Sequence, residues 1–160
     1  MTTNPFTPPS AEVADVHAAG EIRYVGFWPR VGAALIDSIL ILLVTSPLLV
    51  AIYGMAYFEQ DAEGSFMKGP ADLIISWFLP ALISIAFWLR KQATPGKMAI
   101  SAKVVDAKTG GTLSVGQSFL RYLGYFVALL PLGLGILWVA FDARKQGWHD
   151  KLAGTVVIKR

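Results

Sequence analysis

Three stretches of the chain consist almost wholly of apolar residues. They cover residues 31–53, 73–89 and 122–141, and Asp37 is the one charged residue within all three. A helix that crosses the hydrocarbon core of a bilayer needs about 20 apolar residues, within a range of roughly 17–25. The pattern therefore predicts an all-α integral membrane protein with three hydrophobic helical segments, at about 31–53, 73–89 and 118–141.

The third segment contains a helix breaker at its centre. Pro131 is followed closely by Gly133 and Gly135, a combination that interrupts helices. Each half is then about ten residues long, which at about 1.5 Å per residue is too short to span a bilayer. Two alternatives follow: a broken pair that forms a re-entrant hairpin, or a plain third span with a kink.

The basic residues are unevenly distributed, which bears on topology. Residues 54–72 contain a single base, Lys68, whereas residues 90–121 contain six and residues 142–160 contain five. Cytoplasmic loops are enriched in Lys and Arg. We therefore expect the N-terminus and residues 90–121 to lie on the cytoplasmic side. The bases of residues 142–160 favour the re-entrant hairpin, which would return the C-terminus to that side.

The rest of the chain is polar or mixed in character. Residues 1–20 are polar and Pro-rich and are predicted to be a disordered tail, followed by one transmembrane domain over residues 21–160. Residues 98–106 and 112–115 flank the turn sequence of residues 108–111 and are predicted to form a short β-hairpin. Residues 154–159 also have strand character. Together they predict a small cytoplasmic β-hairpin or sheet.

Three motifs occur in order along the chain. The first contains Arg30 and Asp37, the second is Gln92-Ala-Thr-Pro-Gly-Lys97, and the third runs from Phe141 through Asp142 and Asp150. Together they resemble the RDD family of bacterial membrane proteins over about residues 24–160. That family is named for one arginine and two aspartates.

The resemblance has implications for the site and for the activity. Arg30 and Asp37 match the first two signature residues, and either Asp142 or Asp150 is the second aspartate. The resemblance implies a multi-pass protein of the bacterial inner membrane. Cation/proton exchange has been proposed for some family members, so H⁺, Na⁺ and K⁺ are the ions it suggests.

The charged side chains near the first segment could form one network. Asp37 lies two helical turns after Arg30, about 10 Å along the axis and on nearly the same face. A carboxylate at this depth costs a few kcal/mol on insertion scales, so it needs a partner or a proton. If the third segment is a hairpin, Arg121, Asp142 and Asp150 reach the same side. The network would be either an ion-binding site or a salt bridge that fixes helix packing.

Other chemistry is weakly indicated. The chain has no Cys, and His149 beside Asp150 has no second cluster of ligands, so we expect no metal and no cofactor. The segment Thr94–Lys97 lacks the full spacing of a phosphate-binding loop and reads as a turn at a helix end. The net charge of +3 comes from bases that flank the membrane segments. Membrane topology explains these bases, so we do not expect the chain to bind nucleic acid.

Two classes of function remain. One is a cation/proton exchanger in which Asp37 titrates, and the other is a non-catalytic membrane component that aids assembly or binds partner membrane proteins. No nucleophile with its base can be identified, so we do not expect an enzyme. The expected partners are the lipid bilayer and either further copies of the chain or another membrane protein.

Overall fold

The first predicted segment forms a single long helix. The computed structural model describes residues 22–59 and 68–160, so the predicted tail at residues 1–20 lies outside the described residues. Helix α1 spans Phe27–Tyr53, with Pro29 in its first turn, where a missing N–H costs nothing. It ends at Gly54, whose φ of 73° favours glycine. This confirms the helix predicted at about 31–53.

The second predicted segment is also helical but is locally rewound. A short helix α2 (Ala56–Glu59) follows α1, and then α3 (Pro70–Leu73), η3 (Ile74–Phe78) and α4 (Leu79–Lys91) form one continuous helix. The π-helical turn η3 ends two residues before Pro80, whose ring nitrogen cannot donate to the turn preceding it. The helix ends at Gln92, which adopts a left-handed conformation.

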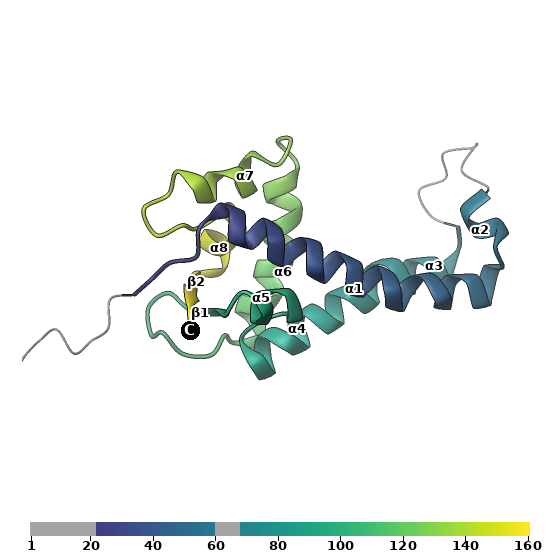
Figure 1. Cartoon of the computed structure of the whole chain (residues 1–160), viewed down its shortest axis with the longest axis horizontal. Helices are drawn as coiled ribbons and strands as arrows, with labels where there is room; N and C mark the ends of the chain where they lie inside the picture. Colours follow the sequence, from purple (N-terminus) through teal and green to yellow (C-terminus); the bar gives the residue numbers. More distant parts are fainter. Residues whose placement is uncertain (1–21, 60–67) are drawn as a thin grey trace, which may run out of the picture.

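The third segment is broken where the sequence predicts. Helix α6 (Val115–Leu129) is followed by α7 (Leu134–Leu137) and the 3₁₀ turn η4 (Trp138–Ala140), and the two parts are bent by 113° (Figure 1). Gly133 at the break has a φ of 77°. Two described helices, Phe27–Tyr53 and Pro70–Lys91, are thus long and apolar enough to cross a membrane, and the bent pair is a broken span or a re-entrant loop.

The strand pairing differs from the prediction. Strand β1 (Ala102–Asp106) pairs antiparallel with β2 (Thr155–Lys159), far away in sequence. The predicted local hairpin is wrong, because residues 112–115 lead into α6. There Ser114 accepts the N–H of Gln117 and completes a capping box. The predicted turn does form, since the Asp106 N–H donates to the Gly111 carbonyl at 3.0 Å.

Both described ends of the chain lie against this sheet. The Val25 N–H donates to the Val157 carbonyl at 3.0 Å, and the Lys159 N–H donates to the Arg23 carbonyl at 2.8 Å. Short helices α5 (Pro95–Ala99) and α8 (Trp148–Ala153) lie at the same end of the molecule (Figure 1). The segment before α1 and the C-terminal strand are therefore at one end of the long helices.

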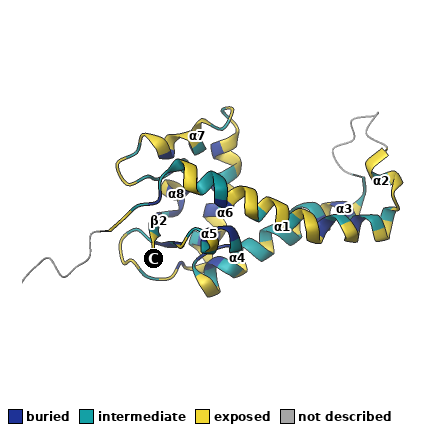
Figure 2. Cartoon of the chain, in the orientation of Figure 1, coloured by how far each residue is buried: buried dark blue, intermediate teal, exposed yellow. Residues whose placement is uncertain are grey.

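The buried core is at this end as well. Val25, Trp88, Val104 and Val157 belong to one buried apolar cluster. By contrast, large aliphatic side chains along the middle of α1 are exposed, and Figure 2 shows that exposed positions dominate this helix. An apolar helix that contacts little protein is typical of a segment surrounded by lipid.

Candidate functional site

A buried carboxylate on α8 is the centre of the charged site. The side chains of Asp150 and Arg121 have 0% exposure, and Arg30 has 11%. Arg30 Nη1 donates to Asp150 Oδ2 at 2.5 Å, and Arg121 Nη1 donates to Oδ1. The Gly147 N–H donates to Oδ2 at 3.0 Å. We refer to Arg30, Arg121 and Asp150 as the Asp150 network.

Arg30 uses all of its guanidinium nitrogens. Besides its bond to Asp150, Nε donates to the Val25 carbonyl at 2.9 Å and Nη2 donates to the Lys145 carbonyl at 2.5 Å. A guanidinium group is rigid and has five N–H donors, so it can hold several acceptors in a fixed geometry. Arg30 thereby fastens the start of α1 to the segment before it, to the loop at residues 142–147 and to α8.

Arg121 joins α6 to the C-terminal strand. Its Nη1 also donates to Thr155 Oγ1 at 2.5 Å. The guanidinium lies 5.3 Å from the ring centroid of Trp88 and 5.9 Å from that of Tyr125. Aromatic faces attract cations, so these rings replace part of the water that a buried guanidinium loses.

The electrostatics of α8 keep Asp150 charged and His149 neutral. Burial alone would raise the pKa of Asp150, but the guanidinium groups of Arg121 and Arg30 outweigh it and hold the pKa well below its usual range. For His149, burial is the main cause that lowers the pKa to about 3, assisted by the nearby cations against the opposing charge of Asp150. The His149 ring stacks on Tyr125, with centroids 4.0 Å apart.

Asp142 lies outside the Asp150 network. Its Oδ2 accepts the N–H groups of Arg144 at 3.0 Å and Gln146 at 3.1 Å, and its Oδ1 pairs with Lys151. Burial alone would raise its pKa, whereas the bond from Lys151 and the two N–H groups lower it. Asp142 therefore shapes the loop before α8. Of the two aspartates in the C-terminal motif, Asp150 is the one that pairs with Arg30.

Asp37 is bound by a different part of the chain. The Thr94 hydroxyl donates to Asp37 Oδ2 at 2.5 Å, and the Gly96 N–H donates to Oδ1 at 2.7 Å. Thr94 and Gly96 are at the start of α5, where the first N–H groups of a helix have no partners of their own. Asp37 thus caps a helix from outside it. Asp37 and Arg30 have separate partners, so the single network predicted from the sequence is divided.

Close packing holds α5 in place for this bond. A Cβ atom added to Gly96 would lie 2.0 Å from the Ala33 carbonyl oxygen. No side chain larger than hydrogen fits at that position without moving α5 away from α1. Gly96 therefore allows the close approach through which α5 reaches Asp37.

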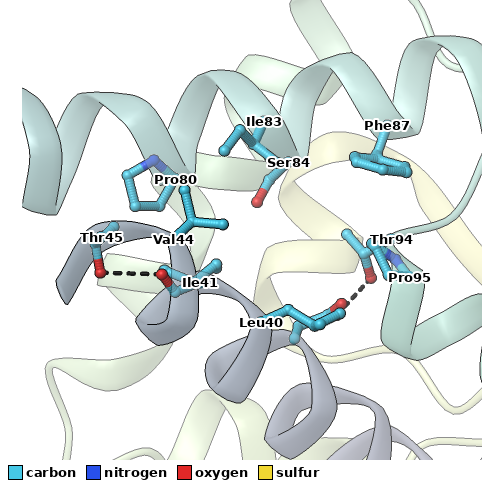
Figure 3. Close-up of a pocket in the computed structure, with 11 residues that line it drawn as sticks. Leu40, Ile41, Val44, Thr45, Pro80, Ile83, Ser84, Phe87, Thr94 and Pro95 are labelled. Atoms are coloured by element: carbon cyan, nitrogen blue, oxygen red, sulfur yellow. Dashed lines mark hydrogen bonds between the residues drawn. The ribbon is translucent and has the colours of Figure 1, made fainter. Parts of the chain in front are cut away.

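Asp37 also borders a cavity of about 350 Å³ between α1 and α4. Its wall is mainly aliphatic, and the Thr45 hydroxyl is already bonded to the Ile41 carbonyl at 2.9 Å. Thr94 and Pro95 lie at one end of the cavity (Figure 3). The side chains that face each other across it are Leu40, Ile41 and Val44 from α1 and Pro80, Ile83 and Phe87 from α4.

A second buried carboxylate lies at the far end of the long helices. Asp72 in α3 has 4% exposure and accepts the Tyr57 hydroxyl at 2.8 Å and the Ser76 hydroxyl at 2.6 Å. The Lys68 N–H donates to the same carboxylate at 2.9 Å. These bonds tie α2 to the start of the second span.

The sequence analysis did not identify several residues that complete the site. Thr94, Gly96 and Thr155 supply the polar partners, and Lys97 is buried with 8% exposure. A usable signal was present for the first two, because Thr94 followed by Pro95 is typical of a helix start, whose unpaired N–H groups need an acceptor. Over residues 22–59 and 68–160, no three His, Asp or Glu side chains are grouped so that they could hold a metal ion.

Comparisons with known proteins are consistent with these motifs. An uncharacterized protein of Rickettsia prowazekii is 40% identical over 113 residues, which cover 68% of this chain and 63% of that protein. The uncharacterized protein YckC of Bacillus subtilis is 33% identical over 82% of each chain. The uncharacterized membrane protein YteJ of Bacillus subtilis is 29% identical over 84% of this chain and 80% of that protein. No solved structure matches the chain.

The family assignment rests on the three motifs and on a match over most of the chain. The family's pattern matches residues 24–154, which include α1, the bent pair and all residues of the Asp150 network. The resemblance stated from the sequence is thereby confirmed, and this chain belongs to the RDD family of membrane proteins.

Proposed function

We propose that the chain is a non-catalytic membrane component that aids assembly of, or binds to, other membrane proteins. The observation that carries this proposal is the saturation of its buried charges. Asp150 receives donors from Arg30, Arg121 and Gly147, and both oxygens of Asp37 receive donors from α5. Charges bound in this way hold helices in fixed positions, as a packing role requires.

We place the chain in the bacterial inner membrane, with the bent pair as a re-entrant hairpin. The Arg30 bond to the Lys145 carbonyl supports this placement, because it returns the chain after η4 to the start of α1. The positive-inside rule then puts the N-terminus, the sheet and the C-terminus in the cytoplasm. Fusing a reporter that is active only outside the cytoplasm to Arg160 tests this, and activity there would refute it.

The partner surface in this proposal is the exposed apolar side of α1. Leu35, Ile39, Leu42 and Leu43 are each at least 58% exposed in the single chain. Lipid covers part of such a surface, and a second copy or another membrane protein can cover the rest. Crosslinking through single cysteines introduced at Ile39 and Leu43, in a chain that has no native Cys, would identify the neighbour.

Cation/proton exchange through Asp37 is the second candidate. It is favoured by one observation, that Asp37 is half-buried at the edge of the cavity between α1 and α4. The Ser84 and Thr94 hydroxyl oxygens line the same cavity and could bind a cation there. A transporting site would also have to release Asp37 from α5 during its cycle.

Flux in proteoliposomes separates the two candidates. The test uses the wild-type chain, Asp37→Asn, and Glu59→Gln as a matched control on the exposed helix α2. The proposal predicts no proton movement driven by Na⁺ or K⁺ in any of the three, with normal folding. Flux that is lost in Asp37→Asn and retained in Glu59→Gln would refute it and establish exchange.

A further inference from the structure

A second cavity lies beside the Asp150 network. It has a volume of about 320 Å³ and lies between α1, α5, the bent pair and α8, the elements gathered at one end in Figure 1. Arg30, Lys97 and His149 are among the residues that line it. Leu35, Ile136 and Val139 are among the apolar residues of its wall. The lining thus combines two cationic side chains with aliphatic ones.

Lys97 is a buried cation without a carboxylate partner. Its one hydrogen bond among the described residues is to Thr94 Oγ1, at the long distance of 3.4 Å, and it forms no ion pair. An ammonium group has three donors, and a buried charge normally needs a counter-charge. Lys97 therefore has unused capacity to bind an anion.

The charges around the cavity do not balance. Among the residues that line the cavity, Arg30 and Lys97 carry positive charges and none carries a negative charge. Arg30 is paired with Asp150, so the charge of Lys97 is left unbalanced. His149 adds none, because burial and then the nearby cations lower its pKa to about 3. The cavity lacks one negative charge.

The depth of the cavity indicates where that charge comes from. Trp28 is 77% exposed at the start of α1, as expected for an aromatic side chain at the level of lipid headgroups. Arg30 follows two residues later, about 3 Å further along the helix axis. Arg30 is therefore near the depth of lipid phosphates. The aliphatic residues that line the cavity suit an acyl chain, which a phospholipid carries on the glycerol next to its phosphate.

We propose that this cavity binds the phosphate of an anionic phospholipid, with Lys97 as the main contact and Arg30 at its side. Phosphate oxygens satisfy the ammonium donors, and the aliphatic wall contacts the start of an acyl chain. The site would bind lipid whether or not the chain moves ions. Free phosphate shares the charged part of this chemistry but could not use the aliphatic wall.

Thermal unfolding of the purified full-length chain in a neutral detergent tests the site. Phosphatidylglycerol, phosphatidylcholine and inorganic phosphate are added separately. We expect phosphatidylglycerol to raise the Tm by on the order of 5 °C at a hundredfold excess over its dissociation constant. Phosphatidylcholine and inorganic phosphate should have much smaller effects. Phosphatidylcholine has the same phosphate beside a choline cation, so an equal rise with it refutes the preference for an anionic lipid, and an equal rise with inorganic phosphate refutes the lipid as ligand.

Three variants make the test specific. Lys97→Met removes the charge and keeps an unbranched side chain, Lys103→Met is a matched control on β1, and Ala34→Phe fills the cavity without changing a charge. We expect the lipid response to vanish in Lys97→Met and Ala34→Phe and to persist in Lys103→Met. A merely structural Lys97 predicts a lower Tm for Lys97→Met without lipid and an unchanged lipid response, which would overturn the proposal. Should Lys97→Met fail to fold, an undiminished response in Ala34→Phe would refute it.

Discussion

Asp150→Asn removes the one negative charge that Arg30 and Arg121 share, with almost no change in the shape of the side chain. In the native structure Oδ2 accepts from Arg30 and Gly147, and Oδ1 accepts from Arg121. An asparagine has one oxygen and one NH₂ group. In either orientation, its NH₂ group would face donors and leave at least one of them unsatisfied.

The expected cost follows from burial. Asp150 and Arg121 have 0% side-chain exposure, so water cannot replace the lost charge. Removing one partner of a buried ion pair costs about 3–5 kcal/mol, against a total stability of about 5–15 kcal/mol for a typical protein. The matched control Asp142→Asn affects a pair with Lys151, which is 44% exposed, and should cost less than about 1 kcal/mol.

The pH sets the window for the measurement. Because the pKa of Asp150 is lowered in the folded state, its stabilisation is fully present above the ordinary aspartate pKa of about 3.9. It is lost as the pH falls through the lower folded-state value. Denaturant unfolding of both variants at pH 7, followed by tryptophan fluorescence in mild detergent, therefore reports the full effect of Asp150.

A double-mutant cycle identifies the cause of the loss. If Asp150→Asn is costly because it leaves Arg121 unpaired, then it should cost less in an Arg121→Met background, with a coupling of about 0.5–3 kcal/mol. Equal losses for Asp150→Asn and Asp142→Asn, or no coupling to Arg121, would refute the reasoning.

Three further changes test other contacts. Gly96→Ala should destabilise the protein by about 1–3 kcal/mol, because its Cβ would lie 2.0 Å from the Ala33 carbonyl oxygen; a native Tm would contradict this. Thr94→Val should cost about 1–3 kcal/mol through the lost bond to Asp37, measured by denaturant unfolding, whereas Thr94→Ser should retain most stability. Since the pKa of His149 is lowered to about 3, the unfolded state binds its proton first, and stability should fall by about 1.4 kcal/mol per pH unit from pH 6.5 down to about pH 3. His149→Phe should remove that slope in pH-dependent unfolding curves, and an unchanged slope would assign it to other groups.

The helices were predictable because their signals are local. An apolar run of sufficient length predicts a span without knowledge of its neighbours, and the two long helices start at Phe27 and Pro70, within four residues of the predicted positions. The break between α6 and α7 was predictable for the same reason, since Pro131 and Gly133 interrupt a helix wherever they occur.

The strand pairing was not predictable in this way. Residues 112–115 and β2 both have strand character, and the choice between them depends on which one buries its side chains against β1. A local signal was also overlooked: Ser114 followed three residues later by Gln117 forms a capping box that starts α6. The capping bonds commit this segment to a helix start, so β1 pairs with the C-terminal strand.

The partners of Arg30 and Asp37 illustrate why long-range pairing needs the fold. Their spacing of seven residues places them on nearly the same face of α1, about 10 Å apart along the axis, which suggested one shared network. In the structure Arg30 instead binds α8, and Asp37 binds the start of α5, where Gly96 permits close contact. One face of α1 thus holds two separate parts of the chain, two helical turns apart. A direct pair would have satisfied these two charges within α1 alone and fixed neither α5 nor α8, so their separate use explains how a single long helix can organise the whole charged end of the protein.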